Sequence, residues 1–201
     1  MTEFYFVRHG QTFANAKGLK QGTIDDEETH LNAIGRQQVR EVREQFDFSF
    51  ANRFIISPLT RTRQTADILN VELQLPVATD ERLLEISYGS WDGKNNNELR
   101  AQYPDVFNPE FNDVTPDYVK YATDGETFDS VIKRVGEFMA DISSKDPDDK
   151  IIVVTHGFTI KAAAINALNL KDPMVIPEPD NLSVTLIKVI NQHAYLYYYN
   201  R

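Results

Sequence analysis

The chain has 201 residues, of which 41% are hydrophobic and 25% are charged, and its formal net charge is −9. This composition is ordinary for a globular protein, and the length is sufficient for a sizeable core in one domain. The absence of cysteine excludes disulfides, thiolate catalysis and cysteine-ligated zinc. The negative charge argues against general nucleic-acid binding, so an anionic ligand would need a local basic pocket.

The amino terminus lacks the pattern of a signal peptide, because Glu3 and Arg8 bracket only four apolar residues. No apolar run in the chain approaches the roughly 20 residues that a membrane-spanning helix needs. We therefore expect a cytoplasmic protein with neither a membrane nor a nucleic acid as a partner.

The first apolar run, Phe4 to Val7, is rich in aromatic and β-branched residues and is typical of a buried strand. It ends in Arg8, His9 and Gly10. In a regular strand Arg8 and His9 would point to opposite faces, so both can serve one site only if the chain leaves the strand there. We expect Gly10 to permit this sharp departure.

A polar loop over residues 17–30 follows, and it is acidic at Asp25 to Glu28. We interpret the acidic run as a solvated loop. Residues 31–46 then have the pattern of an amphipathic helix. The residues on its apolar stripe are Gly35, Val39, Val42 and Phe46.

A second short buried strand, Phe54 to Ile56, runs into Ser57 and Pro58. Serine before proline indicates a helix start, because the hydroxyl caps the helix and proline suits its first position. Arg61 then lies within about one turn of that start. Since helical side chains lean toward the amino terminus, we expect Arg61 to be directed back at the end of the strand.

The middle of the chain begins with a third candidate strand, residues 76–79. A loop over residues 82–93 follows and carries Glu85 among apolar neighbours. Residues 94–103 predict a helix, which Pro104 would end.

The next segment, residues 105–124, is irregular and rich in proline and aromatic residues. We interpret residues 94–126 as a lid or insertion over a pocket, within one domain that spans residues 1–201. Residues 127–143 predict a helix whose apolar face belongs to the core.

Residues 151–155 form the clearest central strand, and it ends in His156 and Gly157 before a predicted helix at residues 158–168. The tail offers two further strands, 182–190 and 194–199, separated by a short turn typical of a hairpin. Strands that alternate with helices imply a three-layer α/β/α sandwich, with a mostly parallel sheet covered on both faces and a C-terminal hairpin.

Polar chemistry follows three of these strands, at Arg8 and His9, at Ser57 to Arg61, and at His156. Ligands of parallel sheets bind beyond the carboxyl ends of the strands, where helix amino termini also favour anions. Guanidinium groups offer paired hydrogen bonds to phosphate oxygens. The pattern therefore predicts a site for a phosphoryl group.

These residues carry a resemblance to the histidine phosphatase superfamily, which includes the cofactor-dependent phosphoglycerate mutases. The matching segments occur in the family's order between about residue 4 and residue 170. They are Arg8 to Asn15, Leu31 to Gln38, Ser57 to Ala66, Leu84 to Gly93, Gly125 to Thr127, and Thr155 to Gly157.

The resemblance implies that His9 is the nucleophile and becomes phosphohistidine, and that Glu85 is first the proton donor to the leaving group and then the base that activates water. The catalytic set that it implies is Arg8, His9, Arg61, Glu85 and His156. The implied substrate- or phosphate-binding residues are Arg8, Asn15, Gln21, Arg61, His156 and Gly157. No cofactor and no metal are implied, because arginines supply the positive charge.

The chain departs from the family pattern at three places. Phe158 replaces a usual second glycine, and we expect it to pack against the following helix. The acidic loop, residues 25–29, is longer than its counterpart. Residues 94–126 lack the arginine pair with which the mutases bind a second phosphate. We therefore expect hydrolysis of a small phosphorylated metabolite.

Two alternatives stay open at this point. One is a cofactor-dependent phosphoglycerate mutase, and the other is a phospholigand-binding regulator built on a non-catalytic scaffold. The identity of the substrate and the oligomeric state are not encoded in any motif that we find.

Overall fold

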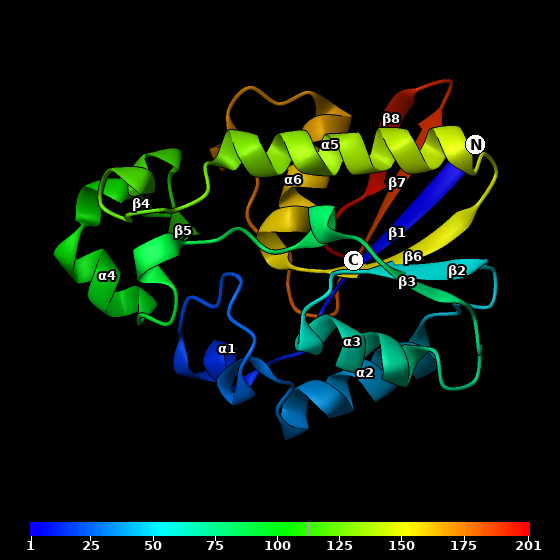
Figure 1. Ribbon diagram of the computed structural model, residues 1–201, viewed down its shortest axis with the longest axis horizontal. Coiled ribbons are helices and arrows are strands. Elements are labelled where there is room, and N and C mark those ends of the chain that lie inside the picture. The colour runs from blue at the N-terminus through cyan, green and yellow to red at the C-terminus, as the bar shows by residue number, and fades with distance from the viewer. Residues whose placement is uncertain (112) are drawn as a thin grey trace.

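The computed structural model describes residues 1–111 and 113–201 (Figure 1). In this part of the chain a six-stranded sheet has the order β3-β2-β6-β1-β7-β8. The strands are β1 (Thr2–Arg8), β2 (Arg53–Ile56), β3 (Val77–Thr79), β6 (Lys150–Thr155), β7 (Val184–Ile190) and β8 (His193–Tyr198). The first four are parallel to one another, β7 pairs antiparallel with β1, and β8 pairs antiparallel with β7. The predicted mostly parallel sheet with a C-terminal hairpin is confirmed.

Helices cover both faces of the sheet, which confirms the three layers (Figure 1). Helices α5 (Phe128–Lys145) and α6 (Gly157–Leu168) lie on one face, and α2 (Ala33–Gln45) and α3 (Thr60–Leu69) lie on the other. The shorter α1 (Phe13–Lys17) and α4 (Asn96–Gln102) lie beyond the carboxyl ends of the parallel strands.

Alternation along the central strands supplies a core on each side of the sheet. On β6, Ile151 and Val153 join the cluster beneath α5 and α6, while Ile152 and Val154 join the cluster above α2 and α3. All four side chains are fully buried. A parallel strand buried on both faces explains why this run is continuously apolar in the sequence.

The segment 94–126 forms a group of short elements at one end of the molecule (Figure 1). After α4 come the 3-10 turn η4 (Pro104–Val106), the paired strands β4 (Phe107–Asn108) and β5 (Asp113–Val114), and the turn η5 (Pro116–Lys120). The aromatic residues pack this group together: the Trp91 and Tyr103 ring centroids are 5.2 Å apart. The segment is therefore more ordered than its irregular sequence predicts.

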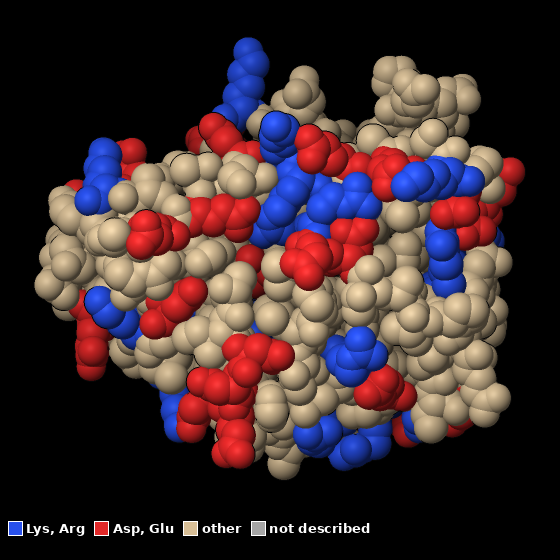
Figure 2. Space-filling view, viewed as in Figure 1, with Lys and Arg blue, Asp and Glu red and all other residues tan. Residues whose placement is uncertain are grey.

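The acidic run is exposed, and Figure 2 shows a cluster of acidic side chains over the segment between α1 and α2. It is more than a solvated loop, however. Asp25 accepts hydrogen bonds from the Thr60 backbone N–H and hydroxyl at 2.9 and 3.0 Å, and so caps α3. Asp26 caps the 3-10 turn η1 (Glu27–Thr29).

The start of α3 differs from the prediction. The helix begins at Thr60 and its N-cap position is Leu59, with no side-chain cap, so the prediction that Ser57 caps a helix beginning at Pro58 is wrong. The Ser57 hydroxyl is instead bound to His156. Arg61 is still in the first turn.

The remaining 3-10 turns are η2 (Glu81–Leu83), η3 (Gly89–Trp91) and η6 (Pro173–Val175). The turn between β7 and β8 consists of Asn191 and Gln192, with φ of 50° and 66°, so His193 belongs to β8. Among the described residues, no helix is both long and apolar enough to cross a membrane.

Candidate active site

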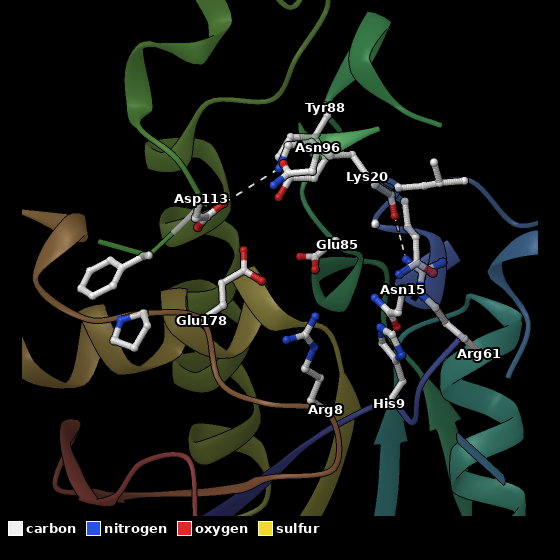
Figure 3. A pocket seen from close by; sticks show the side chains of 16 residues that line it. Arg8, His9, Asn15, Lys20, Arg61, Glu85, Tyr88, Asn96, Asp113 and Glu178 are labelled. Carbon is white, nitrogen blue, oxygen red and sulfur yellow. Dashed lines mark hydrogen bonds and ion pairs between the residues drawn. The ribbon is translucent and has the colours of Figure 1, made fainter. Parts of the chain in front are cut away.

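A cavity of about 290 Å³ lies beyond the carboxyl ends of the parallel strands (Figure 3). It is lined by residues from β1, the first turn of α3, the loops after α1 and η2, the segment 94–126 and the loop before β7. The sequence-predicted residues in its lining are Arg8, His9, Asn15, Gln21, Arg61 and Glu85.

His9 follows the last residue of β1, and its imidazole is 2% exposed. The Nδ1–H donates a hydrogen bond to the Gly10 carbonyl at 2.8 Å. Burial, followed by the charges of Arg61 and Arg8, holds the pKa of His9 well below its usual range. The ring is therefore neutral, and because Nδ1 carries the proton, Nε2 keeps a lone pair.

The glycine after His9 is required for close packing. A Cβ on Gly10 would lie 2.8 Å from the Gly35 carbonyl oxygen of α2, and a Cβ on Gly35 would lie 2.0 Å from the Gln11 carbonyl oxygen. Gly10 does not occupy the left-handed region of φ. The expectation that Gly10 supplies special backbone freedom is thus replaced by a steric reason.

Arg61 is fully buried at the start of α3, and each part of its guanidinium has a partner. Nη2 and Nη1 donate to the carbonyls of Gly22 and Ile24 at 2.7 and 2.9 Å, and Nε donates to Nδ1 of His156 at 3.2 Å. Burial lowers the pKa of Arg61 to about 10, which still leaves it charged at neutral pH. Arg61 is thus a fixed cation in the wall of the cavity.

His156 is fully buried and does not line the cavity. Its Nδ1 accepts from Arg61, so Nε2 carries the proton and donates to the Ser57 hydroxyl at 2.7 Å. Burial and the neighbouring Arg61 hold the pKa of His156 well below its usual range. With both ring nitrogens engaged, His156 orients Arg61 in this structure.

Arg8 lies on the other side of His9, and its Nη1 donates to the Pro179 carbonyl. Gly157, the first residue of α6, does not line the cavity but makes room for this wall. A Cβ at Gly157 would lie 2.2 Å from Oε2 of Glu178 and 3.1 Å from Cζ of Arg8. The absence of a side chain at Gly157 therefore leaves the space that the Glu178 and Arg8 side chains occupy.

Asn15 and Gln21 line the cavity and are both tied to Thr12. Asn15 and Thr12 form a capping box at the start of α1, in which the Asn15 side chain accepts from the Thr12 N–H at 3.1 Å. Gln21 accepts from the Thr12 hydroxyl at 2.9 Å. With their carbonyl oxygens occupied in this way, both side-chain amides keep N–H donors.

Glu85 is 8% exposed, and its carboxylate is held by the chain around it. Oε1 accepts from the Ile86 N–H at 3.0 Å and from the Thr159 hydroxyl at 3.4 Å, and Oε2 accepts from the Phe158 N–H at 3.4 Å. The Phe158 ring is buried against Phe128, with centroids 4.2 Å apart. Phe158 therefore packs in the core, as expected, but this ring contact is with α5 and not with the helix that follows it.

The loop that carries Glu85 is positioned by Arg134 of α5. This guanidinium donates to the carbonyls of Arg82 and Leu84 at 2.7 Å and of Glu85 at 3.2 Å. Glu126 in turn binds Arg134 at 2.9 Å. The Gly125 to Thr127 motif thus acts at a distance, by fixing the arginine that holds the Glu85 loop.

One wall of the cavity consists of residues that were not predicted as site residues from the sequence. Its residues are Lys20, Tyr88, Asn96, Phe111, Asp113, Pro177 and Glu178. Lys20 lies 4.2 Å from the Tyr88 ring centroid, and its Nζ is 3.9 Å from Oδ1 of Asp113. Tyr88 lies within the matched segment that carries Glu85, whereas the other residues of this wall belong to no motif with a local signature.

The sequence model of the histidine phosphatase superfamily, branch 1, matches residues 4–201. The chain belongs to this superfamily. Its relatives include the phosphatase PhoE of Bacillus subtilis, which is 32% identical over 163 residues that cover 81% of this chain and 75% of that protein. Another is the putative phosphoserine phosphatase 2 of Hydrogenobacter thermophilus, 28% identical over 100% of this chain and 96% of that protein.

Solved structures agree with this membership. The fold matches that of Bacillus stearothermophilus YhfR with a TM-score of 0.86 and 26% identity, over 100% of this chain and 97% of that one.

The relatives found by sequence also include a mutase. A 2,3-bisphosphoglycerate-dependent phosphoglycerate mutase from Thermoplasma acidophilum is 29% identical over 78% of this chain and 72% of that protein. The superfamily relatives thus include both phosphatases and mutases, which places this chain among phosphatase- or mutase-type enzymes.

Proposed function

We propose that this protein is a metal-independent phosphatase that hydrolyses a small phosphomonoester through a phosphohistidine at His9. Nε2 of His9 attacks phosphorus, the bond from phosphorus to the ester oxygen breaks, and Glu85 protonates the departing alkoxide. Glu85 then takes a proton from water as that water attacks the phosphohistidine. Phosphate leaves, and His9 and Glu85 return to their starting states.

One observation carries this proposal: a neutral His9 with its lone pair on Nε2 lines the same cavity as two arginines. A histidine nucleophile must be unprotonated, and fixed cations stabilise the charge on the transferring phosphoryl group without reorganising. Asn15 and Gln21 add N–H donors at the same wall. General acid assistance by Glu85 would contribute about 10²–10⁴ in rate.

The charges near the cavity favour hydrolysis over mutase transfer. The cations of the segment 94–126 are Lys94, Arg100 and Lys120, and none of them lines the cavity. The residues that this segment does contribute are Asn96, Phe111 and Asp113. The charged group that this segment contributes to the cavity is thus a carboxylate, with Nζ of Lys20 at 3.9 Å from its Oδ1, and the described residues of the segment place no arginine in the lining for a second phosphate. We further infer that residues 94–126 act as the substrate-selecting lid of a single domain, residues 1–201.

The test is rapid-quench hydrolysis of p-nitrophenyl phosphate with EDTA present, followed by mass spectrometry of the base-stabilised protein. We expect a burst, steady turnover and a phosphoryl group on His9. His9→Ala should lose label and turnover while its circular dichroism is unchanged. His193→Ala, which alters an exposed histidine of β8, is the matched control.

Other outcomes separate the alternatives. Label without turnover, together with isomerisation of phosphoglycerate stimulated by a bisphosphate, would replace the phosphatase by a mutase. Binding of phosphate esters with neither label nor turnover would replace it by a phospholigand-binding regulator. Loss of all activity in EDTA would contradict the metal-independent chemistry.

A further inference from the structure

The wall of the cavity that faces the phosphate-binding residues carries two carboxylates. Figure 3 shows Glu178 and Asp113 on one side of the cavity, across from His9, Asn15 and Arg61. A phosphatase has no need of carboxylates for the phosphoryl group itself, since they repel it. Their position therefore bears on the other part of the substrate, which departs as the alcohol.

The backbone at Glu178 is restrained in this position. It lies between Pro177 and Pro179, which restrict the backbone on both sides. The Pro177 carbonyl accepts from the Tyr199 hydroxyl at 2.6 Å, and the Pro179 carbonyl accepts from Arg8. The missing side chain of Gly157 provides the space that Oε2 of Glu178 occupies. Such preorganisation is what a recognition group needs, because little freedom is lost on binding.

The carboxylate of Glu178 has no hydrogen-bond donor among residues 1–111 and 113–201. The charges that act on it are those of Asp113 from β5, Glu85 from the loop after η2, Arg8 from β1 and Lys161 from α6. Burial and the two neighbouring carboxylates raise the pKa of Glu178 to about 7. A carboxylate in such surroundings is stabilised in its charged form by an added cation.

Asp113 is the second group whose hydrogen bonding is incomplete. Its Oδ2 is buried without a hydrogen-bond donor in the described part of the chain. The Nζ of Lys161 is fully buried, lies 3.9 Å from this oxygen and likewise makes no hydrogen bond there. Lys161 does not line the cavity and supports the charge of Asp113 from behind, whereas Lys20 lies in the cavity wall with its Nζ 3.9 Å from Oδ1 of the same carboxylate.

Buried polar atoms without a partner are rare in folded proteins, and Oδ2 of Asp113 is one of them. The half-buried Glu178 lines the cavity, where a ligand can reach its carboxylate. An ammonium group has three donors and a positive charge, which suits two carboxylates. We infer that Glu178 and Asp113 form a subsite for a protonated amine on the alcohol portion of the substrate. This inference rests on the proposed function, and it names the substrate class as phosphomonoesters of amino alcohols or of hydroxylated amino acids.

The sharpest test compares O-phosphoethanolamine with ethylene glycol monophosphate, two substrates of similar size that differ in an ammonium against a hydroxyl. The readout is the ratio of their kcat/KM values at pH 8, where Glu178 is ionised. Because a hydrogen bond to a charged group contributes about 1.5–3 kcal/mol, we expect the amine to be preferred by about 10- to 100-fold.

Glu178→Gln keeps the shape of the side chain and removes its charge, so the preference should fall to within about 3-fold of unity. Asp113→Asn should lower the ratio in the same direction, and serves if the first variant does not fold. Glu110→Gln removes an exposed lid carboxylate that does not line the cavity, and its ratio should equal that of the wild type. Taking the ratio within each variant cancels any general change in the chemistry.

A wild-type ratio near unity, or a ratio unchanged by Glu178→Gln, would overturn the subsite. Phosphorylation of His9 by p-nitrophenyl phosphate in the same preparation would then show that the phosphatase proposal survives alone. If no ester is turned over, calorimetric affinities of the two esters for wild-type protein and for Glu178→Gln give the same ratio, and so test the subsite independently. The kcat/KM of phosphoserine is then compared with that of phosphoethanolamine. A higher value for phosphoserine identifies an amino acid as the source of the amine, and a higher value for phosphoethanolamine identifies an amino alcohol.

Discussion

Nε of Arg61 donates a hydrogen bond to Nδ1 of His156 over 3.2 Å, and these two residues are 95 positions apart in the chain. The bond fixes the tautomer of His156, whose Nε2–H is then directed to the Ser57 hydroxyl. The plane of the guanidinium is fixed by this bond together with those from Nη1 and Nη2 to the carbonyls of Ile24 and Gly22, in the loop after α1. The start of α3, the loop after α1 and the end of β6 thus meet to orient the Arg61 guanidinium in the cavity wall.

Replacing this guanidinium by an ammonium tests the importance of its orientation. In Arg61→Lys one Nζ cannot reproduce the contacts with His156, Gly22 and Ile24, although the charge is kept. We expect kcat/KM for an aryl phosphate to fall by about 10²- to 10³-fold, as for the loss of a fixed transition-state donor. Steady-state kinetics provide the measurement. Arg63→Lys alters an exposed arginine of the same helix and should stay near wild type; equal losses in both would contradict the orientation argument.

The acidic loop contributes to stability through one residue. Asp25→Ala removes the carboxylate that accepts from the Thr60 N–H and hydroxyl at the start of α3. Loss of a helix cap lowers the free energy of unfolding by about 1 kcal/mol. Urea denaturation measures this change. Glu27→Ala, an exposed neighbour with no such contact, is the control, and an equal midpoint shift in the two variants would mean that net charge and not capping is responsible.

Gly157 is expected to be intolerant of even one methyl group. In Gly157→Ala the Cβ would overlap Oε2 of Glu178, although the backbone conformation itself admits alanine. We expect a loss of about 1–3 kcal/mol in unfolding free energy, typical of overpacking. The double variant Gly157→Ala/Glu178→Ala should recover most of that loss relative to Glu178→Ala. Thermal or urea unfolding of all four proteins closes the cycle, and additive effects would show that the two residues do not share this space.

The protonation of His9 gives a prediction about pH. Because burial and the neighbouring arginines lower its pKa, His9 binds its second proton only at a pH well below the usual 6.5 of histidine. As pH falls from 8 to 6, the ring should therefore remain neutral and the nucleophile available. Long-range ¹H–¹⁵N NMR, with His9→Ala to assign the signals, follows the ring nitrogens directly. A midpoint near 6.5 for His9 would contradict the electrostatic picture of the site.

Much of the fold could be predicted from the sequence because its signals are local. The continuous apolar run of β6 and the stripe of α5 each record which faces are buried, so the elements and the α/β class follow from periodicity. The start of α3 was predicted wrongly because a local rule assigned the Ser57 hydroxyl to a cap. In the folded protein that hydroxyl has a better partner, the buried Nε2–H of His156, which lies 99 residues away in the chain.

The sequence by itself determined the family membership, the order of the elements and the residues Arg8, His9, Arg61 and Glu85 that the cavity brings together. Only the tertiary structure decided the roles of Gly157 and Glu126, and only it placed Lys20, Asp113 and Glu178 in the wall that faces the phosphoryl site. The physical reason is that motifs record a strand end and the turn after it, which are neighbours in the chain. The opposite wall is made by the loop after α1, the lid and the loop before β7, which meet around one space. Residues that meet in this way leave no common spacing in the sequence.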